Sequence, residues 1–220
     1  MMGAWITSNL IWTEGRTILI IAVLVAIFGF FVWKPLFWMT LLFLIWSFYF
    51  FRNPERSCAE ALKGERIIVC PADGRVVDIQ HDTGSLLEGK FAHKISIFLS
   101  AFDVHVNRAP IAGVVNHIEY KPGAFKLAFL PKSSLLNEHN DIIITDDKGR
   151  SVLVRQIAGL VARRICCWVN KGERLAVGQR YGMIKFGSRV DIFLPDNVII
   201  DLKKGQYVYG GQTVLGRWMI

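Results

Sequence analysis

The feature that most constrains this chain is a pair of uncharged apolar runs near its N-terminus. They cover residues 17–33 (TILIIAVLVAIFGFFVW) and 35–51 (PLFWMTLLFLIWSFYFF), and neither contains a charged side chain. A helix of this length spans about 25 Å, at the short end for crossing the hydrocarbon core of a bilayer. Each run therefore predicts a helix that is stable in lipid.

The two runs meet at Lys34-Pro35. Proline lacks a backbone N–H and disfavours helix in the residue before it, so we expect a break there and a helical hairpin. A cleavable signal peptide is not favoured, because such a signal has one shorter apolar core. The sequence thus predicts a membrane-anchoring hairpin at 1–52 and one globular domain at 53–220. Whether the hairpin spans the bilayer or dips into one leaflet stays open.

The charge pattern bears on partners and location. A net charge of +8 could indicate nucleic acid, but the basic residues are scattered and form no run that would track a phosphate backbone, so we expect no nucleic-acid partner. Arg52, Arg56, Lys63 and Arg66 follow the hairpin, where they could face anionic headgroups. By the positive-inside rule, the domain should lie on the cytoplasmic side of the cell membrane.

The remainder of the chain has the pattern of a mainly β domain. Short Val/Ile-rich runs alternate with Gly, Pro and Asp turns, for example RIIVC, KISIFLS, GVVNHIEY and SVLVRQIAG, and residues 146–149 predict a hairpin loop. The phrase G-x-x-x-x-x-G-Q occurs at 172–179 and again at 205–212, and it resembles the barrel-sandwich domains that carry lipoyl or biotinyl groups. We therefore expect a barrel-sandwich (lipoyl/biotinyl-like) β domain behind an α-helical hairpin.

Four polar segments stand out in this domain: PADG at 71–74, LSAFDVHVNRAP at 99–110, NEHN at 137–140 and KFGSRVD at 185–191. Each is a weak signal alone, because P-x-D-G is a common turn and G-S is a trivial dipeptide. Together, in this order and behind a hydrophobic N-terminus, they resemble the phosphatidylserine decarboxylase family in its short bacterial form. The resemblance covers residues 52–218 and includes YKPGAF at 120–125 and QIAG at 156–159.

The resemblance implies a self-processing zymogen. In the family, the serine of the G-S pair attacks the carbonyl of the preceding glycine, here Gly187, and the serine becomes an N-terminal pyruvoyl group. Ser188 would therefore begin an α chain (188–220), released from a β chain (1–187). The pyruvoyl group would be the only cofactor, with no metal. It would decarboxylate phosphatidylserine to phosphatidylethanolamine through a Schiff base with the serine headgroup.

The resemblance also implies roles for other residues. His105 is the candidate general acid or base, and Asp73 is the carboxylate that would orient or stabilise a catalytic imidazole. Longer family members carry D-Y-H-R-x-H, whereas this chain reads D-V-H-V-N-R over 103–108. Arg108 takes the place of the second histidine and stays protonated, so it cannot replace a base. Either His105 performs both tasks, or Arg108 acts electrostatically on the substrate and another group takes the proton.

Two other functions fit parts of the pattern. A non-enzymatic membrane adaptor would combine an anchor with a barrel-sandwich domain, but the long heptad helices of such adaptors are missing from the sequence after Arg52. A membrane serine protease using Ser188 would explain the anchor but not the glycine before the serine. The expected partners are a phospholipid substrate, the membrane and the two chains of one precursor, with a homo-oligomer left open.

Overall fold

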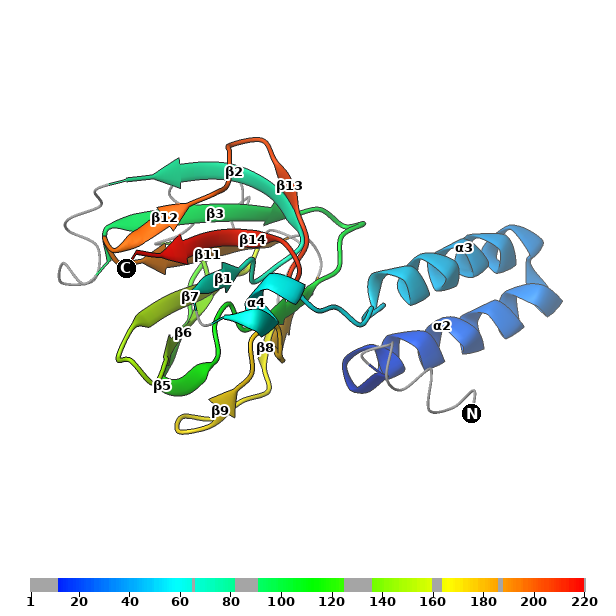
Figure 1. The fold of residues 1–220 in the computed structure, drawn as a ribbon. Coiled ribbons are helices and arrows are strands. Elements are labelled where there is room, and N and C mark those ends of the chain that lie inside the picture. Colours follow the sequence, from blue (N-terminus) through cyan, green and yellow to red (C-terminus); the bar gives the residue numbers. More distant parts are fainter. Residues whose placement is uncertain are drawn as a thin grey trace. The chain divides into compact units, whose positions relative to one another are not determined.

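A computed structural model of the chain describes residues 12–64, 66–81, 91–124, 136–159, 164–185 and 188–219 (Figure 1). The chain forms two compact units, 1–55 and 56–220. The first is helical and the second is built mainly of strands, so the expected mainly β domain behind an apolar helical segment is confirmed. Each unit is described by itself below.

The helical unit is a hairpin of α2 (Trp12–Val32) and α3 (Lys34–Phe50). Only Trp33 separates them, with an extended backbone (φ −154°, ψ 102°), and Pro35 lies in the first turn of α3. The break thus comes just before Lys34-Pro35 rather than at this pair. The reason is that the missing N–H of proline costs nothing in the first turn, where that group has no helical partner.

The hairpin is apolar on its outside as well as its inside. Leu19, Ala22, Ala26 and Leu44 pack between the two helices. Many large apolar side chains on both helices remain exposed, such as Leu24, which is 60% exposed. Within the described part of the chain, one helical stretch, Glu14–Val32, is long and apolar enough to cross a membrane, while α3 has 17 residues.

The second unit begins with the short helix α4 (Ala59–Lys63) and continues with strands. The described strands are β1 (Ile67–Val69), β2 (Gly74–Gln80), β3 (His93–Leu99), β4 (Val106–Arg108), β5 (Gly113–Lys121), β6 (His139–Thr145), β7 (Ser151–Ile157), β8 (Ile165–Cys167), β9 (Arg174–Leu175), β10 (Arg180–Ile184), β11 (Ser188–Leu194), β12 (Val198–Ile200), β13 (Tyr207–Val208) and β14 (Val214–Trp218). The predicted hairpin loop is present between β6 and β7, where Asp146 Oδ1 accepts hydrogen bonds from the backbone N–H groups of Lys148 and Arg150.

Most of these strands form one curled antiparallel sheet, in the order β13-β2-β3-β11-β7-β6-β5-β9. Two further sheets, β1-β14-β12 and β4-β10-β8, complete the described β structure. β11 is central: it pairs with β3 on one side and with β7 on the other. This strand was not expected from hydrophobic alternation, because it contains Arg189 and Asp191. Both are buried, and Arg189 Nη2 donates to Asp191 Oδ2 at 3.0 Å, which compensates each charge.

The domain repeats one arrangement at its two sheet edges. Val76 in β2 is hydrogen-bonded through its backbone to residues 205–206, and Val115 in β5 is bonded in the same way to residues 172–173. The two copies of the G-x-x-x-x-x-G-Q phrase therefore contribute the edge strands β13 and β9, which lie at opposite ends of the strand order. The repeat of the phrase in the sequence thus corresponds to a repeated backbone arrangement in the structure.

The two sheet edges approach each other at the second glycine of each phrase. Gly178 and Gly211 have φ of 75° and 73°, the left-handed region that glycine tolerates without strain. A Cβ on Gly178 would lie 3.6 Å from the carbonyl oxygen of Gly211. The sheet is thus curled like a half-barrel. Its assignment to the lipoyl/biotinyl-like barrel-sandwich type stays a prediction.

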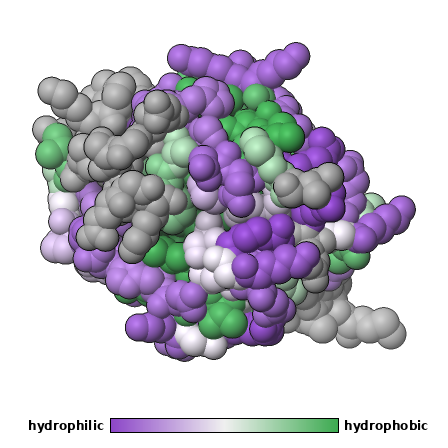
Figure 2. Space-filling model, turned by 60° about the vertical axis from the view of Figure 1, so that its left-hand side comes forward, coloured by the Kyte–Doolittle hydropathy of each residue, from purple (hydrophilic) through white to green (hydrophobic). Residues whose placement is uncertain are grey.

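The curled sheet encloses the main core. Its largest fully buried members include Tyr181, Ile95, Ile97, Ile142 and Ile144. One face of the molecule is covered mainly by hydrophilic side chains with small scattered apolar spots (Figure 2). The apolar excess in the composition therefore does not reside on this face of the surface; much of it lies on the exposed sides of α2 and α3.

Candidate active site

Three of the four polar segments are joined by backbone contacts. The N–H of Arg108 donates to the carbonyl of Pro71 at 2.8 Å, which ties the 99–110 segment to the PADG turn. The N–H of Ile184 donates to the carbonyl of His105 at 3.3 Å, and Ser188 pairs with Leu99 across β11 and β3. The segments that lead to Ser188 and to His105 therefore run alongside each other. The NEHN segment is connected to the 99–110 segment by a series of side-chain hydrogen bonds that is described below.

Ser188 is the first residue of β11 and is fully buried. Its Oγ has no hydrogen-bond partner among the residues that the structure describes. A buried hydroxyl without a partner costs about 1–3 kcal/mol of desolvation, so most such groups are bonded and an exception calls for an explanation. A hydroxyl left free to attack a neighbouring carbonyl fits this observation. Gly187, the other half of the predicted cleavage site, lies outside the described residues.

His105 is also fully buried, and its orientation is fixed. Its Nδ1 lies 2.9 Å from the carbonyl oxygen of Asp103. Since a carbonyl can only accept, Nδ1 carries the proton and Nε2 is the basic nitrogen of the neutral ring. The Asp103 carboxylate in turn accepts from the backbone N–H of Ser100 at 2.7 Å and from the Tyr207 hydroxyl. The loop that holds His105 is therefore braced from two sides.

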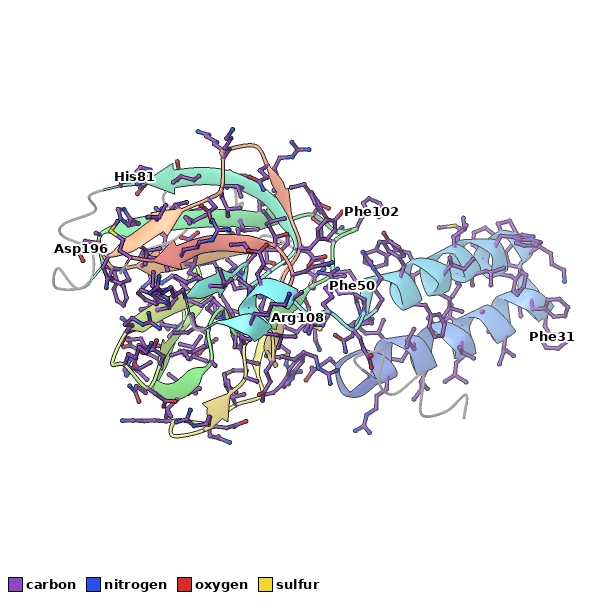
Figure 3. All side chains as sticks on the ribbon, in the orientation of Figure 1. Phe31, Phe50, His81, Phe102, Arg108 and Asp196 are labelled. Atoms are coloured by element: carbon purple, nitrogen blue, oxygen red, sulfur yellow. The ribbon has the colours of Figure 1, made fainter. Side chains whose placement is uncertain are left out.

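The same loop has an exposed tip. Phe102 is 64% exposed, and its side chain projects away from the strands (Figure 3).

Burial, together with the hydrogen bond to Asp103, raises the pKa of Tyr207, so its hydroxyl remains a donor at physiological pH. The bracing contact between Tyr207 and Asp103 is thus insensitive to pH in the neutral range.

Asp73 is buried and paired with Arg56. Nη2 of Arg56 donates to Asp73 Oδ2 at 2.7 Å, Nη1 donates to Oδ1, and the N–H of Gly210 donates to Oδ1 at 2.8 Å. The expected contact of Asp73 with a catalytic imidazole is not found, since no hydrogen bond joins it to His105. Arg56 was expected to face lipid headgroups, but its side chain is only 11% exposed because it is held against this carboxylate. Arg56 was missed as a site residue because no local pattern links it to position 73.

Arg108 lies where the two sheet edges approach each other, at the second glycine of each phrase. Its Nη1 donates to the carbonyl of Gly178 at 3.1 Å, and a Cβ on Gly211 would come within 2.6 Å of its Cδ. Burial, and then the charges of Arg56 and Arg180, lower the pKa of Arg108 to about 10. It therefore remains a cation at neutral pH. The positive charges of Arg56 and Arg180 and the negative charge of Asp73 all act on Arg108, so positive charge predominates around it, which makes the site attractive to an anion.

The described residues contain no group of three or more His, Cys, Asp or Glu side chains placed to hold a metal ion. All four cysteines, Cys58, Cys70, Cys166 and Cys167, are free thiols. Burial, and secondarily the charge of Asp73, raises the pKa of Cys70, so it stays protonated beside the site. The candidate groups of the site are therefore Ser188, His105 and the cluster of Asp73, Arg56 and Arg108.

The matches to known proteins include the region of all four polar segments. A family model described as phosphatidylserine decarboxylase matches residues 43–216. A phosphatidylserine decarboxylase proenzyme of Cereibacter sphaeroides is 43% identical over 205 residues, covering 92% of this chain and 87% of the relative. A protein of the same name from Salinibacter ruber is 49% identical over 176 residues, covering 79% of this chain and 76% of the relative.

Proposed function

Since this chain belongs to the phosphatidylserine decarboxylase family, we propose that it decarboxylates phosphatidylserine to phosphatidylethanolamine with a pyruvoyl group made from its own Ser188. The observation that carries the proposal is the buried Ser188 Oγ at the start of β11, which has no hydrogen-bond partner in the described part of the chain and lies next to the segment of His105. The pyruvoyl ketone would supply an electron sink for the electron pair that stays on the substrate carbon when carbon dioxide departs. The alternative of a non-enzymatic adaptor is not favoured by the relatives, which are named as decarboxylase proenzymes.

Three residues divide the work in this proposal. His105, with Nε2 as its basic nitrogen, moves the proton during turnover. Asp73 supports self-cleavage: it holds Arg56 in place and offsets part of the positive charge around Arg108. Arg108 binds the anionic headgroup, because it stays charged and carries the planar fork that suits a phosphate or a carboxylate.

We further propose that the α2–α3 hairpin anchors the enzyme in the membrane, with the decarboxylase domain on the cytoplasmic side. Support comes from the exposed apolar side chains of both helices and from the basic residues Arg52, Lys63 and Arg66 that follow. A lipid substrate gives this arrangement its purpose, since the headgroup and the enzyme then share one surface.

The intact mass of the purified protein tests the proposed maturation. Two polypeptides are expected, residues 1–187 and 188–220, and the shorter one should resist Edman degradation because its N-terminal amine has been replaced by a ketone. Its mass should be lower by one ammonia than that of a simply hydrolysed chain. A fully active protein consisting of one uncut chain would contradict the proposal.

Deleting residues 1–51 should release the domain from membranes while self-cleavage continues, because the described groups of the site all lie in unit 56–220. The measurement is co-sedimentation with vesicles at high salt, together with a denaturing gel. High salt screens the residual attraction of the basic residues for anionic lipid. A truncated protein that still sedimented with vesicles under these conditions would show that the hairpin is not the main anchor.

A further inference from the structure

A second unpartnered polar atom lies in the 99–110 segment. Asn107 is fully buried, and its Nδ2 has no hydrogen-bond partner among the described residues. An amide N–H₂ carries two strong donors, so leaving it unbonded in the interior is costly. The proposed roles of Ser188, His105, Asp73 and Arg108 do not use this group.

The orientation of the Asn107 amide is set by a chain of side-chain hydrogen bonds. Asn140 Nδ2 donates to Gln156 Oε1 at 3.1 Å, and Gln156 Nε2 donates to Asn107 Oδ1 at 2.7 Å. This series of hydrogen bonds runs from the NEHN segment through β7 to β4, so each side-chain amide fixes the orientation of the next. Since Oδ1 of Asn107 is occupied by Gln156, its Nδ2 must point the other way.

The sheet register brings this series of hydrogen-bonded amides close to Ser188. Gln156 lies directly opposite Val190 on β11, and Val190 follows Ser188 by two residues, which places both on the same face of the strand. Asn107 lies opposite Gly182 on β10. A Cβ at Gly182 would lie 3.0 Å from Gln156 Nε2, so the glycine leaves room for the amide to reach Asn107. His105 precedes Asn107 by two residues on the same segment.

We propose that the Asn107 side-chain amide is the donor that stabilises the oxyanion formed when Ser188 cuts the chain. This inference rests on the proposed self-cleavage. In that step, Ser188 Oγ bonds to the preceding carbonyl carbon and gives its proton to a general base, which is His105 Nε2 if that residue performs both tasks. The carbonyl oxygen becomes an oxyanion that accepts from Nδ2. Its collapse breaks the C–N bond, the Ser188 nitrogen takes a proton, and an ester remains.

A donor that is unused in the ground state and engaged in the transition state is the arrangement that accelerates a reaction. This explains why the fold retains an amide on β4 and a hydroxyl at the start of β11 that both lack a hydrogen-bond partner among the described residues. Gln156 and Asn140 are then positioning residues, since they act on the reaction only through Asn107.

The test follows self-cleavage directly in the full chain, made by cell-free synthesis and sampled over time on a denaturing gel. Asn107→Leu, which is close in size but lacks the donor, should slow cutting about 10²- to 10³-fold. If the leucine variant does not fold, as judged by the lack of a cooperative unfolding transition, Asn107→Asp replaces it, because aspartate keeps the acceptor for Gln156 but lacks the donor. Tyr181→Phe is the matched control: its hydroxyl is also buried and has no partner within the described ranges, and the variant should cut at the wild-type rate.

Neutral hydroxylamine separates the first step from the later elimination, because it cleaves esters but not amides. If Asn107 stabilises the oxyanion, slow variants should contain no ester, and hydroxylamine should not speed their scission. Scission on addition of hydroxylamine, or cutting of both Asn107 variants at the wild-type rate, would overturn the inference. A wild-type chain that is never cut would instead refute the proposed maturation itself.

Discussion

Ser188→Ala is expected to leave a single uncut chain without decarboxylase activity. Alanine offers no nucleophile, so neither the cut nor the ketone can form. Stability should not fall, because Ser188 Oγ makes no described hydrogen bond that the substitution would break. The measurements are a denaturing gel, the conversion of phosphatidylserine in vesicles to phosphatidylethanolamine, and thermal unfolding.

Ser96→Ala is the matched control for this experiment. Ser96 is likewise a buried serine, on the neighbouring strand β3, where it pairs with Asp191 of β11. Its loss should leave both cutting and turnover intact. Normal cutting of the Ser188→Ala chain would place the scissile bond elsewhere, and normal turnover by an uncut chain would exclude the pyruvoyl mechanism.

His105→Ala should lose decarboxylation by about 10²- to 10⁴-fold per cut chain, the usual cost of a missing general acid or base. Two quantities must be measured for each variant: the fraction of chain that is cut, and the turnover per pyruvoyl group formed. His117→Ala is the control, because its side chain is 48% exposed and pairs only weakly with Glu119. Wild-type values of both quantities in His105→Ala would refute its assignment.

Two further variants complete this division of labour. Asp73→Asn should act mainly on cutting, because it removes the charge that holds Arg56 and offsets the neighbouring guanidinium groups. Arg108→Lys should cut normally but show a raised KM, since lysine lacks the bidentate fork. If Arg108→Lys were not cut, the arginine would have taken over part of the role of the missing second histidine.

Local pattern was sufficient for the hairpin and most of the strands. An uncharged run of 17 residues has few alternatives to a helix in lipid, and Val/Ile runs between turn residues leave little choice but strands. The pattern failed at β11, whose Arg189 and Asp191 suggest an exposed segment. Burial there depends on pairing between side chains, as it does for Arg155 and Asp141 on β7 and β6, and such pairing becomes visible only when the strands are assembled.

The site shows the same division. The four polar segments could be recognised along the chain, but their contacts depend on the tertiary fold. Arg56 precedes Asp73 by 17 positions without any motif between them, yet its guanidinium group donates hydrogen bonds to both carboxylate oxygens of Asp73. Asn107 reads as an ordinary residue of a short strand until its amide is seen to be held by Gln156. Sequence could name the candidate nucleophile and histidine, but not the groups that orient them.

The central position of β11 has a consequence for the lifetime of the enzyme. A cut before Ser188 leaves a 33-residue chain whose β11, β13 and β14 pair with β3, β7, β2 and β1 of the other chain. The two pieces should therefore stay associated without a covalent link. Once unfolded, however, they would have to find each other in solution, so refolding becomes second order in concentration. The mature enzyme would then persist through slow unfolding rather than through reversible equilibrium, unlike its single-chain precursor.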